Sequence, residues 1–100
     1  GSLQAEMLAT TRRQGLLAYP LAPRLQDLLS EVAAGNPVIV LQNLSLAFAP
    51  LWHYAVVVGY DRERGEIILR SGATRRLAMT LSTFERTWAR SGHWAMVVLQ

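Results

Sequence analysis

Three segments of the chain carry apolar residues at the spacing of a helix face. The first predicts a helix over residues 3–14, with Ser2 as its N-cap and Gly15 as its stop. The second starts at Pro23, which fits the first position of a helix because no N–H has to be satisfied there, and it ends at Gly35. Its apolar residues recur at i, i+3, i+4 and i+7: Leu25, Leu28, Leu29 and Val32.

The third helical segment opens on a capping-box pattern. Ser82 is followed three residues later by Glu85, a spacing at which each side chain can bond the other residue's backbone N–H. The segment carries Phe84 and Trp88 and ends at Gly92. We interpret Trp88 as a core anchor of this helix.

Runs of apolar and β-branched residues between these helices predict strands. The run over 37–42 is apolar on both faces, as is typical of a buried strand, and the turn over 61–65 favours a hairpin. The last strand opens at His93, which we interpret as a structural residue. The predicted extended segments are 16–22, 37–42, 51–60, 66–70, 75–79 and 93–99. The order of elements predicts an α+β fold in a single domain over residues 1–100, a mostly antiparallel sheet with flanking helices.

The strand over 51–60 has two unlike faces, because successive side chains of a strand point to opposite sides. One face is large and aromatic: Trp52, Tyr54, Val56, Val58 and Tyr60. The other is smaller toward its C-terminal end: Leu51, His53, Ala55, Val57 and Gly59. Small side chains let another backbone approach, so we expect a groove on this face with His53 at its end.

Composition narrows the possible functions. The chain has 100 residues, about half of them apolar, which allows one modest core. Its ten basic residues are all arginines, they are scattered among glutamates, and the net charge is +3, so we expect a solvated surface and no nucleic-acid partner. No apolar run reaches the roughly 18–20 residues of a membrane helix, and we expect no membrane insertion. There is no cysteine, which excludes a disulfide and a thiolate metal site, and we expect neither a metal nor a cofactor.

Four segments in order, GNPVIVLQN, HYAVVVGYD, EIILRSG and FERTWARSGHWAMVVL, resemble the C39-like branch of the papain-like cysteine peptidases over residues 24–99. The resemblance implies part of a papain-like fold, with His53 in the position of the catalytic histidine, the general base. It implies that the nucleophilic cysteine and its oxyanion-hole glutamine lie upstream of Gly1. It also implies a peptide or protein substrate, in a bacterial protein whose compartment, cytoplasm or cell envelope, stays open.

The third member of the family's triad is replaced in this chain. Where the family has Asp-Pro, the sequence has Ser71-Gly72. A hydroxyl can bond an imidazole but cannot stabilise an imidazolium as a carboxylate does. Asn43 or Asp61 could orient His53 instead, although Asp61 and Ser71 are also typical turn residues.

Two functions therefore stay open. The chain is either the histidine-bearing part of a cysteine peptidase, inactive by itself, or a non-catalytic relative that binds a peptide or a neighbouring domain. Under both hypotheses the face of His53, Ala55, Val57 and Gly59 lacks the helix that covers it, and we expect an exposed apolar patch there. A second copy, a swapped helix 3–14 or an upstream fragment is the expected cover.

Overall fold

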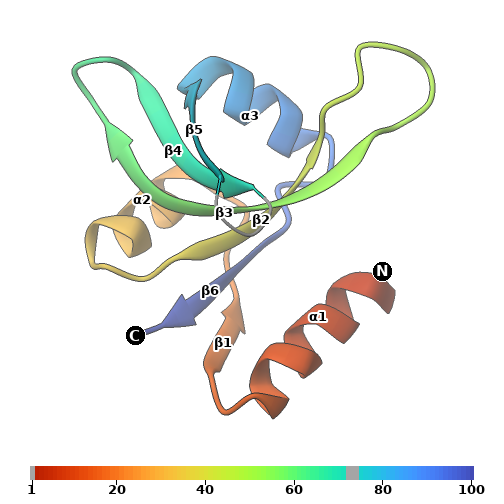
Figure 1. Ribbon diagram of the computed structural model, residues 1–100, viewed down its shortest axis with the longest axis vertical. Helices are drawn as coiled ribbons and strands as arrows, with labels where there is room; N and C mark the ends of the chain where they lie inside the picture. Colours follow the sequence, from red (N-terminus) through yellow and green to blue (C-terminus); the bar gives the residue numbers. More distant parts are fainter. Residues whose placement is uncertain (1, 72–74) are drawn as a thin grey trace.

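The computed structural model describes residues 2–71 and 75–100, which form three helices and six strands (Figure 1). In chain order the elements are α1 (Ser2–Arg13), β1 (Leu17–Pro20), α2 (Leu25–Ala33), β2 (Val38–Asn43), β3 (Trp52–Asp61), β4 (Glu66–Ser71), β5 (Arg75–Thr80), α3 (Leu81–Ala89) and β6 (Ala95–Leu99). The predicted helices and strands are all present, within a few residues of their expected ends.

The six strands form one sheet in the order β1-β6-β2-β3-β4-β5. Every neighbouring pair is antiparallel. Strands β2 to β5 follow one another in sequence, whereas β6 lies between β1 and β2, with Val97 opposite Val38 and Leu17 opposite Leu99. The predicted α+β class with a mostly antiparallel sheet is confirmed.

Helices cover the two faces of the sheet unequally. Helices α2 and α3 pack on one face and form the main core with alternate residues of the strands: Leu28, Val32, Val38, Val40, Ala55, Val57, Ile67, Leu69, Phe84, Trp88, Ala95 and Val97. Helix α1 contributes Met7 and Leu8 to a smaller cluster on the other face, around Met96 and Val98. Full burial of a large apolar side chain contributes about 1.5–3 kcal/mol, so α2 and α3 are the more firmly held helices.

Helix α2 keeps its predicted apolar stripe but starts later than expected. Its N-cap is Arg24 and its first helical residue is Leu25, so Pro23 precedes the cap instead of occupying the first helical position. Gly35 follows the helix with a φ of +88°, a left-handed conformation that glycine adopts without steric cost. The end of the helix is thus as predicted, and the start is shifted by two residues.

The capping box predicted for α3 is wrong. The N-cap is Thr80, whose Oγ1 accepts a hydrogen bond from Thr83 N at 3.2 Å. Ser82 is consequently inside the first turn. Glu85 contacts His93 and not the start of the helix.

A β-bulge changes the predicted faces of β3. Val57 pairs with Leu69, but the next pair is Gly59 with Ile68, so Val58 is the extra residue. The bulge reverses the alternation beyond it, and Tyr60 packs against the main core instead of joining the aromatic face.

The exposed groove predicted on the His53 face is also wrong. Ala55 and Val57 are buried in the main core, beneath α2 and α3 of this same chain. The solvent-exposed side chains of β3 lie on the opposite face and include Trp52 and Val58. No second copy or outside segment is needed to cover Ala55 and Val57.

Candidate functional site

The strands β3 and β4 bring His53 and Ser71 together. His53 is the second residue of β3 and Ser71 is the last residue of β4. Because Val56 pairs with Arg70 in the ladder, Ser71 lies diagonally across from His53 on the face that α3 covers. The Oγ atom of Ser71 is 2.6 Å from Nε2 of His53, which is hydrogen-bonding distance. Both side chains are half-buried.

The hydrogen bond leaves the second ring nitrogen of His53 available. Within residues 2–71 and 75–100, Ser71 is the hydrogen-bond partner found for the imidazole. In the tautomer whose Nε2–H donates to Ser71 Oγ, Nδ1 carries a lone pair and can accept a proton. In the other tautomer Ser71 Oγ donates to Nε2 and Nδ1 carries the hydrogen, so the contact orients the ring in both cases.

The buried side-chain amide of Gln42 lies next to this pair and was not predicted from the sequence. Gln42 is opposite His53 in the β2–β3 ladder and is only 1% exposed. Its Nε2 donates to Thr87 Oγ1 of α3 at 2.9 Å. Val38, Val40 and Gln42 alternate onto the core face, so a polar residue in an otherwise apolar series was the available signal.

Asn43 makes no hydrogen bond to His53 in the part of the chain that the structure describes. Its Oδ1 accepts hydrogen bonds from Ser45 N at 3.0 Å and from Leu51 N at 2.9 Å, and it thereby closes the loop between β2 and β3. The carboxylate of Asp61 accepts from Arg64 N in the β3–β4 turn, as expected of a turn residue. Asp61 is eight residues along β3 from His53, about 26 Å at the rise of a strand, too far to contact the ring.

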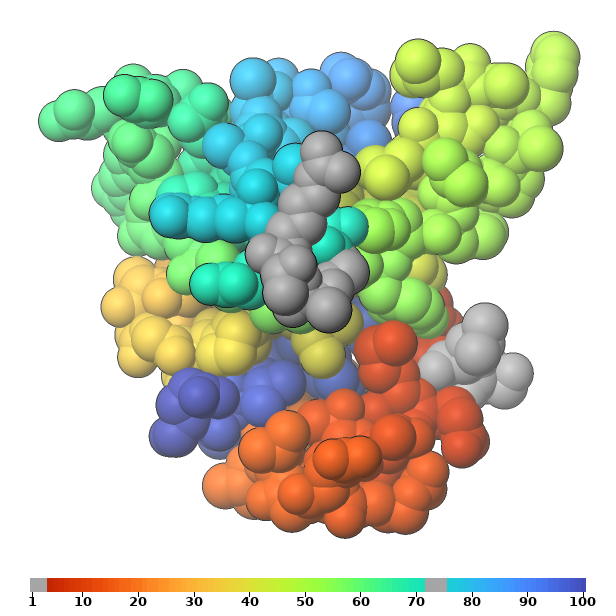
Figure 2. Space-filling view, in the orientation of Figure 1, coloured from red at the N-terminus to blue at the C-terminus, as the bar shows by residue number. Residues whose placement is uncertain are grey.

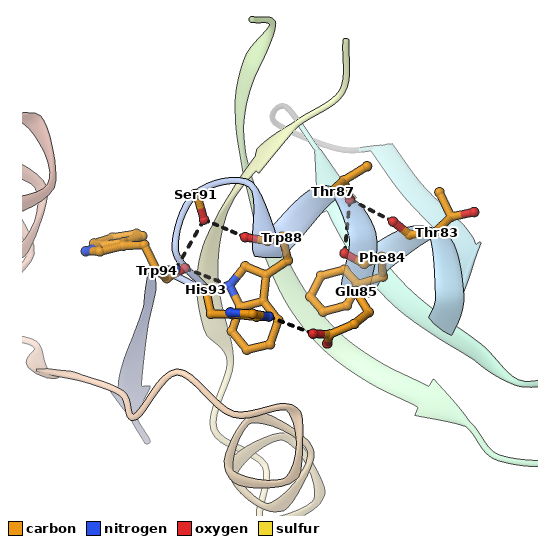
Figure 3. Close-up of polar contacts among 8 residues, drawn as sticks. All are labelled: Thr83, Phe84, Glu85, Thr87, Trp88, Ser91, His93 and Trp94. Carbon is orange, nitrogen blue, oxygen red and sulfur yellow. Dashed lines mark hydrogen bonds and ion pairs between the residues drawn. The ribbon is translucent and has the colours of Figure 1, made fainter. Parts of the chain in front are cut away.

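The second histidine belongs to a separate polar cluster at the end of α3 (Figure 3). Nε2 of His93 is 2.6 Å from Glu85 Oε1, and its ring meets that of Trp88 edge-on at 4.7 Å. Trp88 Nε1 donates to Trp94 O, while Ser91 Oγ donates to Trp88 O and accepts from Trp94 N. His93 therefore helps to fix the turn between α3 and β6.

The described part of the chain contains no cluster of three or more side chains that could hold a metal ion. None of its three helices is long and apolar enough to cross a membrane. Gly72, the neighbour of Ser71 in the predicted turn, lies outside the described residues.

The sequence and the fold of the chain are both similar to those of known proteins. The model of the Peptidase C39 like family matches residues 10–96. No curated protein matches the chain. Among solved structures, the chain is similar to the crystal structure of a Bacillus anthracis protein assigned as a C39-like peptidase, with a TM-score of 0.71 and 18% sequence identity. The match covers 90% of this chain and 55% of that one, so the chain spans about half the length of its structural relative. At this identity the likeness shows the fold.

Proposed function

The chain belongs to the peptidase C39-like family, and we propose that it is the histidine-bearing part of a cysteine peptidase domain in which His53 is the general base. The observation that carries the proposal is the 2.6 Å contact between His53 Nε2 and Ser71 Oγ. In peptidases of this kind a third group fixes the imidazole, and the free ring nitrogen takes the proton of the nucleophile. Ser71 would be that third group.

The proposed reaction uses a cysteine that is not among these 100 residues. His53 Nδ1 accepts the thiol proton, and the thiolate attacks the carbonyl carbon of a peptide bond. The imidazolium then donates the proton to the leaving amine, and water releases the acyl group from sulfur. By itself the 100-residue chain is expected to cleave no peptide by this route.

The test is thiol-dependent hydrolysis of peptides by the complete protein. His53→Ala is expected to lower kcat by about 10²–10⁴-fold, the usual contribution of a general base. His93→Ala is the matched control, because His93 is also half-buried and hydrogen-bonded but lies in the separate cluster at the end of α3. Activity that is unchanged in His53→Ala contradicts the proposal.

The role of Ser71 needs its own variants. Ser71→Ala is expected to lower kcat, and Ser71→Asp to restore or exceed the original rate, because a carboxylate also stabilises the imidazolium. Ser82→Ala is the control, since Ser82 is an exposed serine of α3. A rate for Ser71→Ala equal to that of Ser82→Ala would remove Ser71 from the site.

A second candidate function is a non-catalytic module that binds a peptide or a neighbouring domain. It is favoured by the hydroxyl of Ser71 in the position of the family's carboxylate. Iodoacetamide labelling of the complete protein at low pH distinguishes the two candidates, because only an activated cysteine reacts there. A complete protein that has no such cysteine and still binds peptides supports the second candidate.

A further inference from the structure

The loop between β2 and β3, residues 44–51, presents large apolar side chains to solvent. Leu46 is 98% exposed and Phe48 107%, and at the base of the loop Leu51 is 59% and Trp52 51% exposed. The loop projects at the upper right in Figures 1 and 2, away from the sheet. From residue 43 to residue 52 the sequence has no charged residue. Clustered exposed apolar side chains of this kind mark interaction sites.

The base of the loop is closed by hydrogen bonds. Leu44 N donates to Leu51 O at 2.9 Å, and Asn43 Oδ1 accepts from the N–H groups of Ser45 and Leu51. Ser45 Oγ additionally accepts from Ala47 N at 3.0 Å. These bonds hold the backbone on either side of Leu46 in one conformation.

Helix α3 supplies a second support for the loop. Arg90, the C-cap of α3, donates from Nη1 to Asn43 O at 2.9 Å and to Ser45 O at 2.8 Å. Arg90 is followed directly in sequence by the polar cluster after α3, in which Ser91 Oγ donates to Trp88 O (Figure 3). A loop that is already held in place loses less entropy when a ligand binds it.

The size and chemistry of the loop select its partner. A stable dimer buries about 800 Å² on each partner, supplied by about 20–30 residues a side, which four exposed side chains cannot provide. A second copy would also bring the same net positive charge. A short peptide with bulky apolar side chains fits a small, uncharged and preformed surface.

The loop leads directly into the candidate site. Leu51 is two residues before His53, about 7 Å along an extended chain. We propose that residues 44–51 bind an apolar segment of the polypeptide on which the His53 site acts, with Leu46 and Phe48 as the main contacts. This inference rests on the proposed function and narrows its substrate class to peptides with large apolar residues near the cleaved bond.

The experiment compares Leu46→Ser and Phe48→Ser with the control Leu16→Ser in the complete protein. Leu16 is also an exposed leucine, in the connection between α1 and β1 at the bottom of Figure 1, far from the β2–β3 loop at the top. With peptides that carry Leu or Phe near the cleaved bond, Phe48→Ser is expected to raise KM by about ten- to hundredfold while kcat stays within about twofold. With matched peptides that carry Ser there, the three variants should behave alike. Equal KM values for Phe48→Ser and Leu16→Ser with the apolar peptide overturn the inference.

Binding measured in a His53→Ala background separates this inference from the proposed function. Tryptophan fluorescence titration should give the same Kd for the apolar peptide as in the parent protein, and Phe48→Ser should weaken that Kd. If the parent protein binds the apolar peptide through Phe48 but cleaves no peptide, the peptidase proposal is refuted. Peptide binding by residues 44–51 is then still supported. Light scattering that shows a dimer, lost in Phe48→Ser, identifies a second copy as the occupant and overturns the inference.

Discussion

Replacing Thr87 by valine tests whether the buried contact between Gln42 and Thr87 holds α3 on β2. Gln42 Nε2 donates to Thr87 Oγ1 at 2.9 Å, and its other neighbour, the sulfur of Met79 at 3.5 Å, is a weak acceptor. Valine keeps the shape of threonine and removes the oxygen. A fully buried amide group then loses its strong partner, and the free energy of unfolding is expected to fall by about 1–3 kcal/mol.

Replacing the other partner, Gln42→Met, is expected to lower the free energy of unfolding by less, at most about 1 kcal/mol. The hydroxyl of Thr87 keeps a partner in that variant, because it can still donate to Thr83 O at 2.9 Å or to Phe84 O at 3.0 Å. With both residues replaced no polar group is left unpaired. The double variant should therefore lose about 1–2 kcal/mol less than the sum of the two single losses.

Urea unfolding followed by tryptophan fluorescence, to which the buried Trp88 contributes, measures all three variants, and the m-value should not change. Two results would refute the reasoning. One is a Thr87→Val variant no less stable than Gln42→Met. The other is a double variant whose loss equals the sum of the single losses.

Three further comparisons use the same unfolding assay. Thr80→Ala removes the N-cap of α3 and should cost about 1 kcal/mol, whereas Ser82→Ala should cost less than about 0.5 kcal/mol; equal costs would contradict the assignment of the cap. Gly35→Ala places a side chain at a φ of +88° and should lower the free energy of unfolding by about 1–2 kcal/mol. Gly59→Ala should be nearly neutral, because its Cβ would meet Ile68 at an ordinary contact distance of 3.6 Å. A larger loss at Gly59 than at Gly35 would mean that the bulge requires glycine. His93 has a φ of +58°, a conformation that glycine adopts more easily than alanine. Both His93→Gly and His93→Ala lose the contact with Glu85, so the difference between them measures the backbone alone, and the glycine variant should be more stable by about 1 kcal/mol. The opposite order would show that the backbone there is not strained.

The elements of the fold could be predicted because their signals are local. The stripe of α2 is a helical repeat in sequence, and it is buried as predicted at Leu28 and Val32. The bulge in β3 has no such signal, because residues 55–58 are all apolar and the register shift at Val58 depends on how β4 pairs. The cap of α3 was missed for a related reason. Thr80 and Ser82 are both good caps, and the choice depends on where β5 stops pairing with β4.

The candidate site was predicted in part. The resemblance to a family pointed to His53 and Ser71, and the structure brings them within hydrogen-bonding distance, while their catalytic roles stay predictions. Gln42 was missed because its place opposite His53 follows from the register of two strands, which the sequence does not state. The loop-closing contacts of Asn43 could not be predicted, because they depend on the conformation of residues 44–51.

The position of β6 in the sheet has a consequence for the order in which the protein can fold during synthesis. The ribosome makes β1 before the other strands of this sheet, but the neighbour of β1 is β6, the last of the six strands. Strands β2 to β5 pair with their sequence neighbours and can assemble as they emerge, whereas β1 has no partner until β6 has been made. Until then β1 and the edge of β2 that later pairs with β6 stay unpaired, and we expect chaperones to bind the nascent chain there.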